Sequence, residues 1–164
     1  MSQVSGAASL SNARLVAILL PVALLGGAIG SQYLGGLFPC EMCYWQRWPH
    51  LAAIFAALAA IVLRGNPPMS ATFTALAAFA IATSGAIGLF HAGVEYRWWE
   101  GFTTCTSLKP VGGDMLEAIM NAPLIRCDQA QWTLWGISLA GYNAILSLGG
   151  AALIFLFLRR WSKP

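Results

Sequence analysis

Residues 51–63 of the chain read LAAIFAALAAIVL, a stretch without a single polar position. A strand of a membrane β-barrel alternates apolar and polar side chains over segments of roughly ten residues, whereas this stretch is apolar on every face. Helices and closed barrels are the structures that span a bilayer. The stretch therefore predicts a membrane helix, and the charged residues around it show how far the pattern extends.

Charged residues divide the sequence into four long stretches that contain no charge. A membrane span needs roughly 20 apolar residues, so the short second stretch must begin upstream and carry Arg47 within its first turns. We predict spans at about 14–34, 41–63, 69–91 and 132–158, which form an all-α transmembrane four-helix bundle. The uncharged stretches are Leu15–Cys40, Trp48–Leu63, Gly65–Val94 and Gln129–Leu158.

The composition agrees with a membrane protein. Of 164 residues, 58% are hydrophobic and 9% are charged, whereas about a quarter of an ordinary soluble domain is charged. The length fits a single membrane domain over 1–164. The net charge of +3 is scattered without any basic run, which argues against nucleic-acid binding.

The charges also predict the orientation. An even number of spans places both termini on one side, which collects basic residues and no acidic ones, so that side is the cytoplasm. All acidic residues and the four cysteines lie on or near the other side, where a loop of about 92–131 joins the third and fourth spans. We expect a short amphipathic helix over 113–121 of that loop. The cytoplasmic basic residues are Arg14, Arg64, Arg159, Arg160 and Lys163.

Two alternatives concern the first and third spans. The first stretch resembles a signal peptide, but its apolar run exceeds a signal core of roughly 7 to 15 residues. Small residues recur at four-residue spacing as Gly26 with Gly30, and as Ser84 with Gly88. This spacing predicts close packing between helices.

A C-x-x-C motif opens the second span in the stretch PCEMCYWQR, residues 39–47. A helix N-terminus and a nearby arginine both stabilise a thiolate, and cysteines of this motif often have a lowered pKa. Cys43 and Arg47 are four residues apart, so they share one face of the helix. Cys43 is therefore the predicted reactive thiolate, with Cys40 as its partner.

Cys105 and Cys127 bracket the outer loop. A zinc site shared with Cys40 and Cys43 is one alternative, but the spacing does not give a second C-x-x-C, and an outer compartment favours disulfides. A structural disulfide that closes the loop is another alternative. Two cysteine pairs on one side of a membrane can, however, exchange by thiolate attack on a disulfide. We predict that all four cysteines are catalytic and that no metal is bound.

A thiol oxidase needs an electron acceptor, and the sequence contains no dinucleotide fingerprint and no set of haem or iron–sulfur ligands. We therefore expect a membrane-soluble quinone, either ubiquinone or menaquinone. Arg47 beside Cys43 is the predicted quinone-binding residue, the alternative being an arginine that reaches lipid phosphate. His91 and His50 are further candidates for the pocket, although a lone histidine at an interface is often a packed side chain.

The chain resembles the DsbB family of bacterial inner-membrane disulfide-bond formation proteins. The resemblance covers the four spans, the C-x-x-C followed by Gln46-Arg47, and the cysteine pair of the second outer loop. The stretch CDQAQWTLWGISLAGYN, residues 127–143, is similar to the start of the family's fourth span. Met42 stands where the family often has leucine.

The resemblance implies a protein-disulfide oxidoreductase that reoxidises a periplasmic DsbA-like protein of thioredoxin fold. It further implies that Cys105 forms the mixed disulfide with this partner and that Cys127 pairs with Cys105. Electrons then pass through a transient bridge between Cys40 and Cys127, and Cys43 reduces the quinone with help from Arg47. Both termini would be cytoplasmic and the cysteines periplasmic, with His91 in the quinone pocket.

Two other protein classes stay open at this point. A quinone-linked oxidase of the vitamin K epoxide reductase type has the same chemistry, but in that family the loop cysteines precede the C-x-x-C, and here they follow it. A soft-metal-binding or transport membrane protein would use the cysteines as ligands without turnover. Bound zinc or copper, measured beside free thiols, would separate these classes.

Overall fold

The computed structural model describes residues 2–101 and 126–162. Four helices in these two ranges are long and apolar enough to cross a membrane, namely Gly6–Tyr33, Glu41–Gly65, Pro67–Glu95 and Leu139–Trp161. The predicted all-α membrane bundle is thus confirmed. The amphipathic helix predicted over 113–121 lies outside the described residues.

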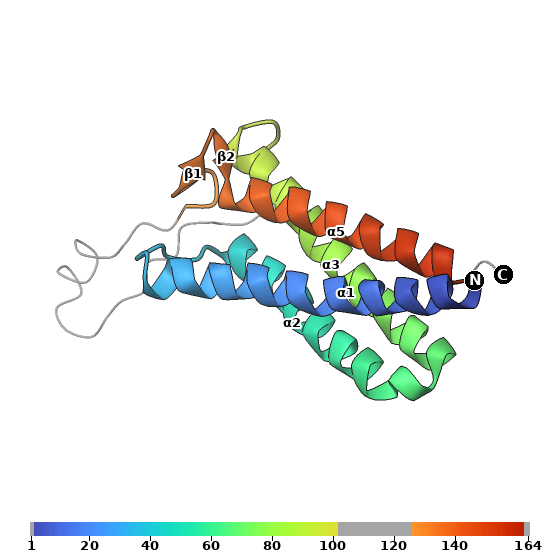
Figure 1. Cartoon of the computed structure of the whole chain (residues 1–164). Coiled ribbons are helices and arrows are strands. Elements are labelled where there is room, and N and C mark those ends of the chain that lie inside the picture. Colours follow the sequence, from blue (N-terminus) through green and yellow to red (C-terminus); the bar gives the residue numbers. More distant parts are fainter. Residues whose placement is uncertain (1, 102–125, 163–164) are drawn as a thin grey trace, which may run out of the picture.

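The helices form an antiparallel bundle in which α1 and α3 each pack on both α2 and α5. Figure 1 shows both chain ends at one end of the bundle and two short strands at the opposite end, which we call the hairpin end. The elements are α1 (Ser2–Tyr33), α2 (Glu41–Val62), the 3₁₀ helix η1 (Leu63–Gly65), α3 (Pro67–Glu95), β1 (Thr133–Leu134), β2 (Ile137–Ser138) and α5 (Leu139–Trp161).

Side-chain caps fix where the helices begin. Asn66 accepts a hydrogen bond from the backbone N–H of Met69 (3.2 Å) at the start of α3, and Pro67 follows in the first turn, where a proline removes no helical hydrogen bond. Ser138 caps α5 by accepting from the N–H of Gly141 (3.1 Å). Cys40 occupies the same position before α2, so the C-x-x-C begins at a helix N-terminus.

The fourth membrane helix begins at Leu139 rather than near residue 132. The preceding residues form an antiparallel hairpin in which Leu134 pairs with Ile137. The two residues between them, Trp135 and Gly136, have φ angles of 49° and 78°, as the tight turn of a two-residue hairpin requires. The hydroxyl of Tyr96 donates to the carbonyl of Gly136 (3.0 Å), which ties the hairpin to the end of α3.

Small residues bring α3 against α5, whereas Gly26 and Gly30 do not bring α1 against another helix. A Cβ added at Gly88 would lie 2.9 Å from Nδ2 of Asn143 and 3.0 Å from the carbonyl of Ala140. A Cβ added at Gly26 or Gly30 would meet nothing within 4 Å in the described part of the chain. The packing role predicted for the Ser84 and Gly88 pair is therefore confirmed, whereas the role predicted for Gly26 and Gly30 is wrong.

Candidate active site

Cys40 and Cys43 are free thiols at the hairpin end of α2, and their sulfur atoms lie 2.8 Å apart. The sulfur of Cys40 also accepts a hydrogen bond from the backbone N–H of Cys43 (3.3 Å). The side chain of Cys43, together with burial, raises the pKa of the Cys40 thiol. In a pair that has lost one proton, the remaining proton therefore stays on Cys40 and the negative charge lies on Cys43.

Arg47 lies one helical turn beyond Cys43 and binds α1. Its Nη1 donates to Oε1 of Gln32 (2.6 Å) and its Nη2 donates to the carbonyl of Ala28 (2.9 Å). The guanidinium also stands 5.2 Å from the ring centre of Tyr44. These contacts hold the guanidinium of Arg47 against α1. Within the described residues, two of its five N–H donors make side-chain hydrogen bonds.

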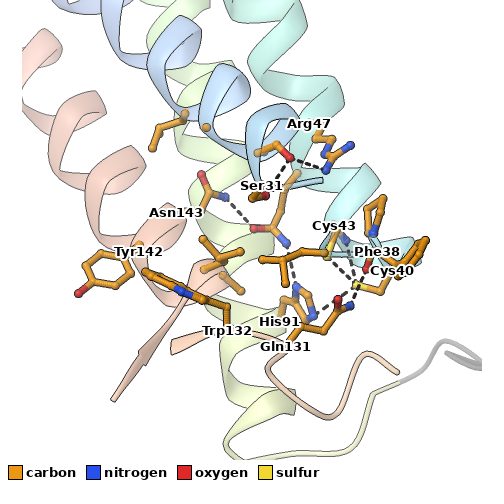
Figure 2. Close-up of a pocket in the computed structure, with 18 of the residues that line it drawn as sticks. Ser31, Phe38, Cys40, Cys43, Arg47, His91, Gln131, Trp132, Tyr142 and Asn143 are labelled. Carbon is orange, nitrogen blue, oxygen red and sulfur yellow. Dashed lines mark hydrogen bonds between the residues drawn. The ribbon is translucent and has the colours of Figure 1, made fainter. Parts of the chain in front are cut away.

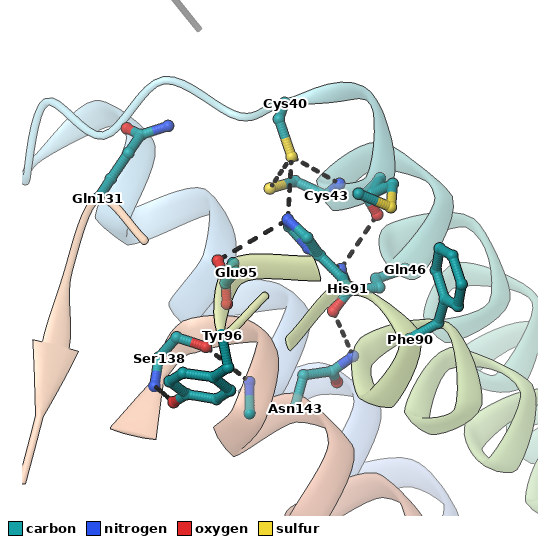
Figure 3. A network of polar contacts seen from close by, with 12 residues as sticks. Cys40, Cys43, Gln46, Phe90, His91, Glu95, Tyr96, Gln131, Ser138 and Asn143 are labelled. Atoms are coloured by element: carbon teal, nitrogen blue, oxygen red, sulfur yellow. Dashed lines mark hydrogen bonds and ion pairs between the residues drawn. The ribbon is translucent and has the colours of Figure 1, made fainter. Parts of the chain in front are cut away.

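His91 of α3 faces the thiol pair across the bundle. Its Nε2 lies 3.6 Å from the sulfur of Cys40 and 3.7 Å from Oε1 of Glu95, one turn further along the same helix. The side chains of His91 and Glu95 are only 3% and 7% exposed. Figure 3 shows the imidazole between the Cys40 sulfur and the Glu95 carboxylate.

The other ring nitrogen of His91 belongs to a buried polar network. Nε2 of Gln46 lies 2.9 Å from Nδ1 of His91 and donates to the backbone carbonyl of Met42 (3.0 Å). Oε1 of Gln46 accepts from Nδ2 of Asn143 on α5 (2.8 Å). On the far side of Asn143, Oδ1 lies 2.9 Å from Nε2 of His50. The network therefore joins α2, α3 and α5 beneath the thiols.

A cavity of about 260 Å³ lies beside this network. The thiols, Arg47 and the two histidines line it together with apolar and small residues of α1. Figure 2 shows Cys40, Cys43, Arg47 and His91 among the lining side chains. The segment before α5 completes the wall, because Nε2 of Gln131 donates to the carbonyl of Phe38 (2.5 Å). Lining residues include Leu24, Gly27, Ala28, Cys40, Cys43, Arg47, His50, His91, Trp132, Tyr142 and Asn143.

Cys127 lies at the same site. It is fully buried in a cluster with Cys40, Met42 and Val94, against which Cys43 and Phe90 also pack. Its backbone hydrogen-bonds His91, and its own sulfur is engaged in a disulfide. The structure thus brings Cys40, Cys43, Arg47, His91 and Cys127 together, while Cys105 lies outside the described residues.

Cys40, Cys43 and His91 also offer three donor atoms within 4.8 Å of one another, which by type would suit a zinc ion. The hydrogen bonds of Gln46 oppose this use. Because the Gln46 amide donates to Nδ1 of His91, the proton of the neutral ring sits on Nε2, the atom that faces the thiols. A metal at that position would have to displace this proton and turn the amide.

Three residues of this site were not predicted as site residues from the sequence: Gln46, Glu95 and Asn143. The signal for Gln46 was present, since Met42, Gln46 and His50 recur every four residues on the buried face of α2, where a polar residue among apolar ones needs partners. Asn143 stands within a long uncharged stretch in the same way. Glu95 was assigned to the outer loop because the end of α3 was expected near residue 91.

A known protein family matches most of the chain. The profile of the family described as disulfide bond formation protein DsbB matches residues 11–157. A disulfide bond formation protein B of Methylococcus capsulatus is 31% identical over 158 residues, covering 90% of this chain and 92% of that protein.

Two further relatives cover similar lengths. One of Acidovorax sp., also named disulfide bond formation protein B, is 29% identical over 87% of this chain and 83% of its own. An uncharacterised protein of Rickettsia prowazekii is 25% identical over 88% of this chain and 84% of its own. No solved structure matches. With four membrane helices and a dithiol at the hairpin end, the chain belongs to the DsbB family of disulfide bond formation proteins.

Proposed function

We propose that this member of the DsbB family is a quinone-dependent thiol oxidase that reoxidises a DsbA-like dithiol protein. The observation that carries the proposal is that Cys40 and Cys43, whose sulfurs lie 2.8 Å apart, line the same cavity as Arg47. In this proposal the hairpin end faces the periplasm of a bacterial inner membrane and both termini are cytoplasmic. The end that holds the termini carries basic residues and no acidic ones, which supports this orientation.

The cavity fits the ring of a quinone. Small residues of α1, among them Gly27 and Ala28, leave space beside the thiols, and binding sites for small molecules are mostly apolar with a few placed polar groups. Arg47 provides N–H donors for a ring oxygen, and its contacts with Gln32 and Ala28 hold the guanidinium in place before a ligand arrives. A bound quinone would accept two electrons and two protons.

The first half of the reaction is thiol–disulfide exchange. When Cys40 and Cys43 are joined as a disulfide, a thiolate of the loop pair attacks the sulfur of Cys40, and Cys43 leaves as a thiolate. The burial of Cys127 against Cys40 supports this choice of sulfur. Arg47, one turn away, stabilises the charge that develops on Cys43.

Release of Cys40 completes the exchange. The second loop thiolate attacks the loop sulfur of the bridge, the loop disulfide forms, and Cys40 leaves as a thiolate. Two N–H groups face its sulfur: the backbone N–H of Cys43 at 3.3 Å and Nε2 of His91 at 3.6 Å. These donors stabilise the leaving thiolate. The free dithiol of the described structure corresponds to this reduced state of the pair.

The second half regenerates the disulfide. Two electrons and two protons leave the Cys40 and Cys43 thiols, an S–S bond forms between them, and the bound ring takes up both electrons and both protons. Because Cys43 carries the charge and lies beside Arg47, it is the sulfur nearest the electron acceptor. Cys40 then closes the disulfide from 2.8 Å away.

The test is quinone reduction by the purified full-length protein with a reduced thioredoxin-fold protein as donor. We expect one quinone to be reduced for each donor disulfide formed. The ultraviolet absorbance of the quinone measures its reduction, and a count of free thiols measures oxidation of the donor. Cys43→Ser should abolish turnover. Donor oxidation without quinone consumption, or equal turnover in Cys43→Ser, would contradict the proposal.

A further inference from the structure

His50 has no part in the reaction described above, although it lines the same cavity. It lies on the buried face of α2 and is 3% exposed. Seven residues separate it from Cys43, which at 1.5 Å per residue places it about 10 Å deeper along the helix and on nearly the same face. His50 therefore lines the cavity deeper along α2 than the two thiols do, and we call the part of the cavity beside His50 its inner end.

The hydrogen bonds of Asn143 determine which nitrogen of His50 carries the proton. Nδ2 of Asn143 contacts the backbone carbonyl of Ser84 (3.1 Å), which can only accept, and Oε1 of Gln46 (2.8 Å). This fixes the orientation of the Asn143 amide, so its Oδ1 faces His50 and accepts the proton of Nε2 (2.9 Å). The hydroxyl of Ser147 donates to the same oxygen (2.9 Å).

In the neutral ring, Nδ1 of His50 is consequently a bare lone pair. It is buried and has no hydrogen-bond partner among the described residues. A buried acceptor without a partner costs roughly 1–3 kcal/mol in protein mutational data, so such atoms usually meet a ligand or water. The chemistry of a lone pair specifies the ligand: it must bring a hydrogen-bond donor.

We propose that Nδ1 of His50 accepts a hydrogen bond from a ring hydroxyl of the hydroquinone, the reduced form of the electron acceptor. The inference rests on the proposed function and extends it by assigning the inner end of the cavity to the product. A quinone carbonyl at this position would face a lone pair, whereas a hydroxyl donates to it. The inner end therefore distinguishes the two redox forms.

This arrangement has a consequence for the reaction. The thiols supply two electrons and two protons to the ring, and they become a disulfide as the ring becomes a hydroquinone. A site that binds the reduced ring more tightly than the oxidised ring favours this direction, because only differential affinity shifts an equilibrium. His50 thus stabilises the hydroquinone at the ring oxygen farthest from Cys43. Arg47 binds the ring oxygen nearer to Cys43.

The experiment measures binding rather than turnover. Purified full-length protein, with Cys40 and Cys43 oxidised to the disulfide, is titrated without oxygen with a short-chain hydroquinone and with the matching quinone. We expect the wild type to bind the hydroquinone more tightly. His50→Leu should reduce the ratio of the two affinities by about fivefold or more, the worth of one hydrogen bond.

Two variants make the comparison specific. His50→Asn keeps an oxygen near the position of Nδ1 and should retain most of the preference. Ser147→Ala removes a neighbour of Nε2 while leaving Nδ1 in place, and its ratio should equal that of the wild type. His50→Met replaces His50→Leu if the leucine variant melts too early to be titrated.

The outcomes separate the two proposals. If the wild type binds neither ring form, the quinone-dependent function is wrong. If it binds both forms equally, or if the apolar variants keep the wild-type ratio, the role of His50 is wrong and the quinone site stands. A hydroquinone preference that His50→Leu or His50→Met removes and His50→Asn retains supports the inference.

Discussion

Nε2 of Gln46 lies 2.9 Å from Nδ1 of His91, while Oε1 of the same amide accepts from Nδ2 of Asn143 at 2.8 Å. A turned amide would place its oxygen against the carbonyl of Met42 and its nitrogen against Nδ2 of Asn143, so both contacts would become repulsive. The amide therefore donates to Nδ1, and the proton of the neutral imidazole stays on Nε2. The Nε2–H thus faces the sulfur of Cys40, with the carboxylate of Glu95 and the backbone of Cys127 as its other neighbours, before any thiolate forms.

From this tautomer we predict the behaviour of Cys40 in His91 variants. His91→Leu removes a donor that stabilises the thiolate, so ionisation of Cys40 should require a higher pH, by about one pH unit for a hydrogen bond to a charged group. The measurement is the rate of alkylation of Cys40 against pH in a Cys43→Ser background, read by mass spectrometry of the Cys40 peptide.

His91→Gln is the matched control, since its amide nitrogen can take the position of Nε2 and donate to the same sulfur. Its alkylation profile should stay near that of the parent. Identical profiles for the leucine, glutamine and parent proteins would show that His91 does not stabilise the Cys40 thiolate.

For Arg47 we predict a loss confined to the quinone step. Arg47→Leu should raise the KM for quinone about tenfold or more, because a charged donor held beside Cys43 is lost. A single turnover without quinone, in which a reduced donor protein reduces the enzyme's disulfides, should keep its extent. Arg64→Leu removes the same charge from an exposed position at the other end of the bundle and should change neither quantity.

The loop cysteines should show the opposite pattern. Cys127→Ser or Cys105→Ser should stop oxidation of the donor protein while leaving quinone affinity within about twofold of the wild type, since the proposed ring position lies beside α2. Donor oxidation is followed by thiol counting and quinone affinity by titration. Lost quinone binding in either variant would mean that the loop pair forms part of the quinone site.

The fold could be predicted from the sequence because the uncharged stretches that indicate membrane helices are long and occur four times. Each predicted span reaches the length that a bilayer demands, and charged residues separate one uncharged stretch from the next. The end of α3 and the start of α5 were less predictable. The turn at Trp135 and Gly136 needs positive φ angles at both residues, and tryptophan rarely signals such a turn.

From the sequence, only those site residues could be predicted that lie close to one another along the chain. Cys40, Cys43 and Arg47 share one helix, so their spacing already implied their proximity. Asn143 meets Gln46 and His50 across the bundle, and a contact between residues about a hundred positions apart leaves no spacing pattern. Gly26 and Gly88 stand in similar motifs, and only the three-dimensional packing shows that one of them contacts a neighbouring helix.

The close contact between Gly88 and α5 leads to a final prediction, which concerns the packing that holds Asn143. Gly88→Ala places a methyl group 2.9 Å from Nδ2 of Asn143 and 3.1 Å from the backbone nitrogen of Ala144. Backbone cannot yield as a side chain can, so α5 must move away from α3, at a cost of about 1–3 kcal/mol. The movement also pulls the Asn143 amide away from Gln46, which frees His91 to place its proton on either nitrogen.

Gly88→Ala should therefore lower the thermal unfolding temperature in detergent and, below that temperature, shift the alkylation profile of Cys40 towards higher pH. Gly149→Ala on α5 is the control, since its added Cβ meets nothing within 4 Å in the described residues, and alanine is the better helix former by about 1 kcal/mol. It should leave the profile unchanged and the stability equal or higher. A Gly88→Ala protein with wild-type stability and profile would show that the contact between α3 and α5 does not position the network.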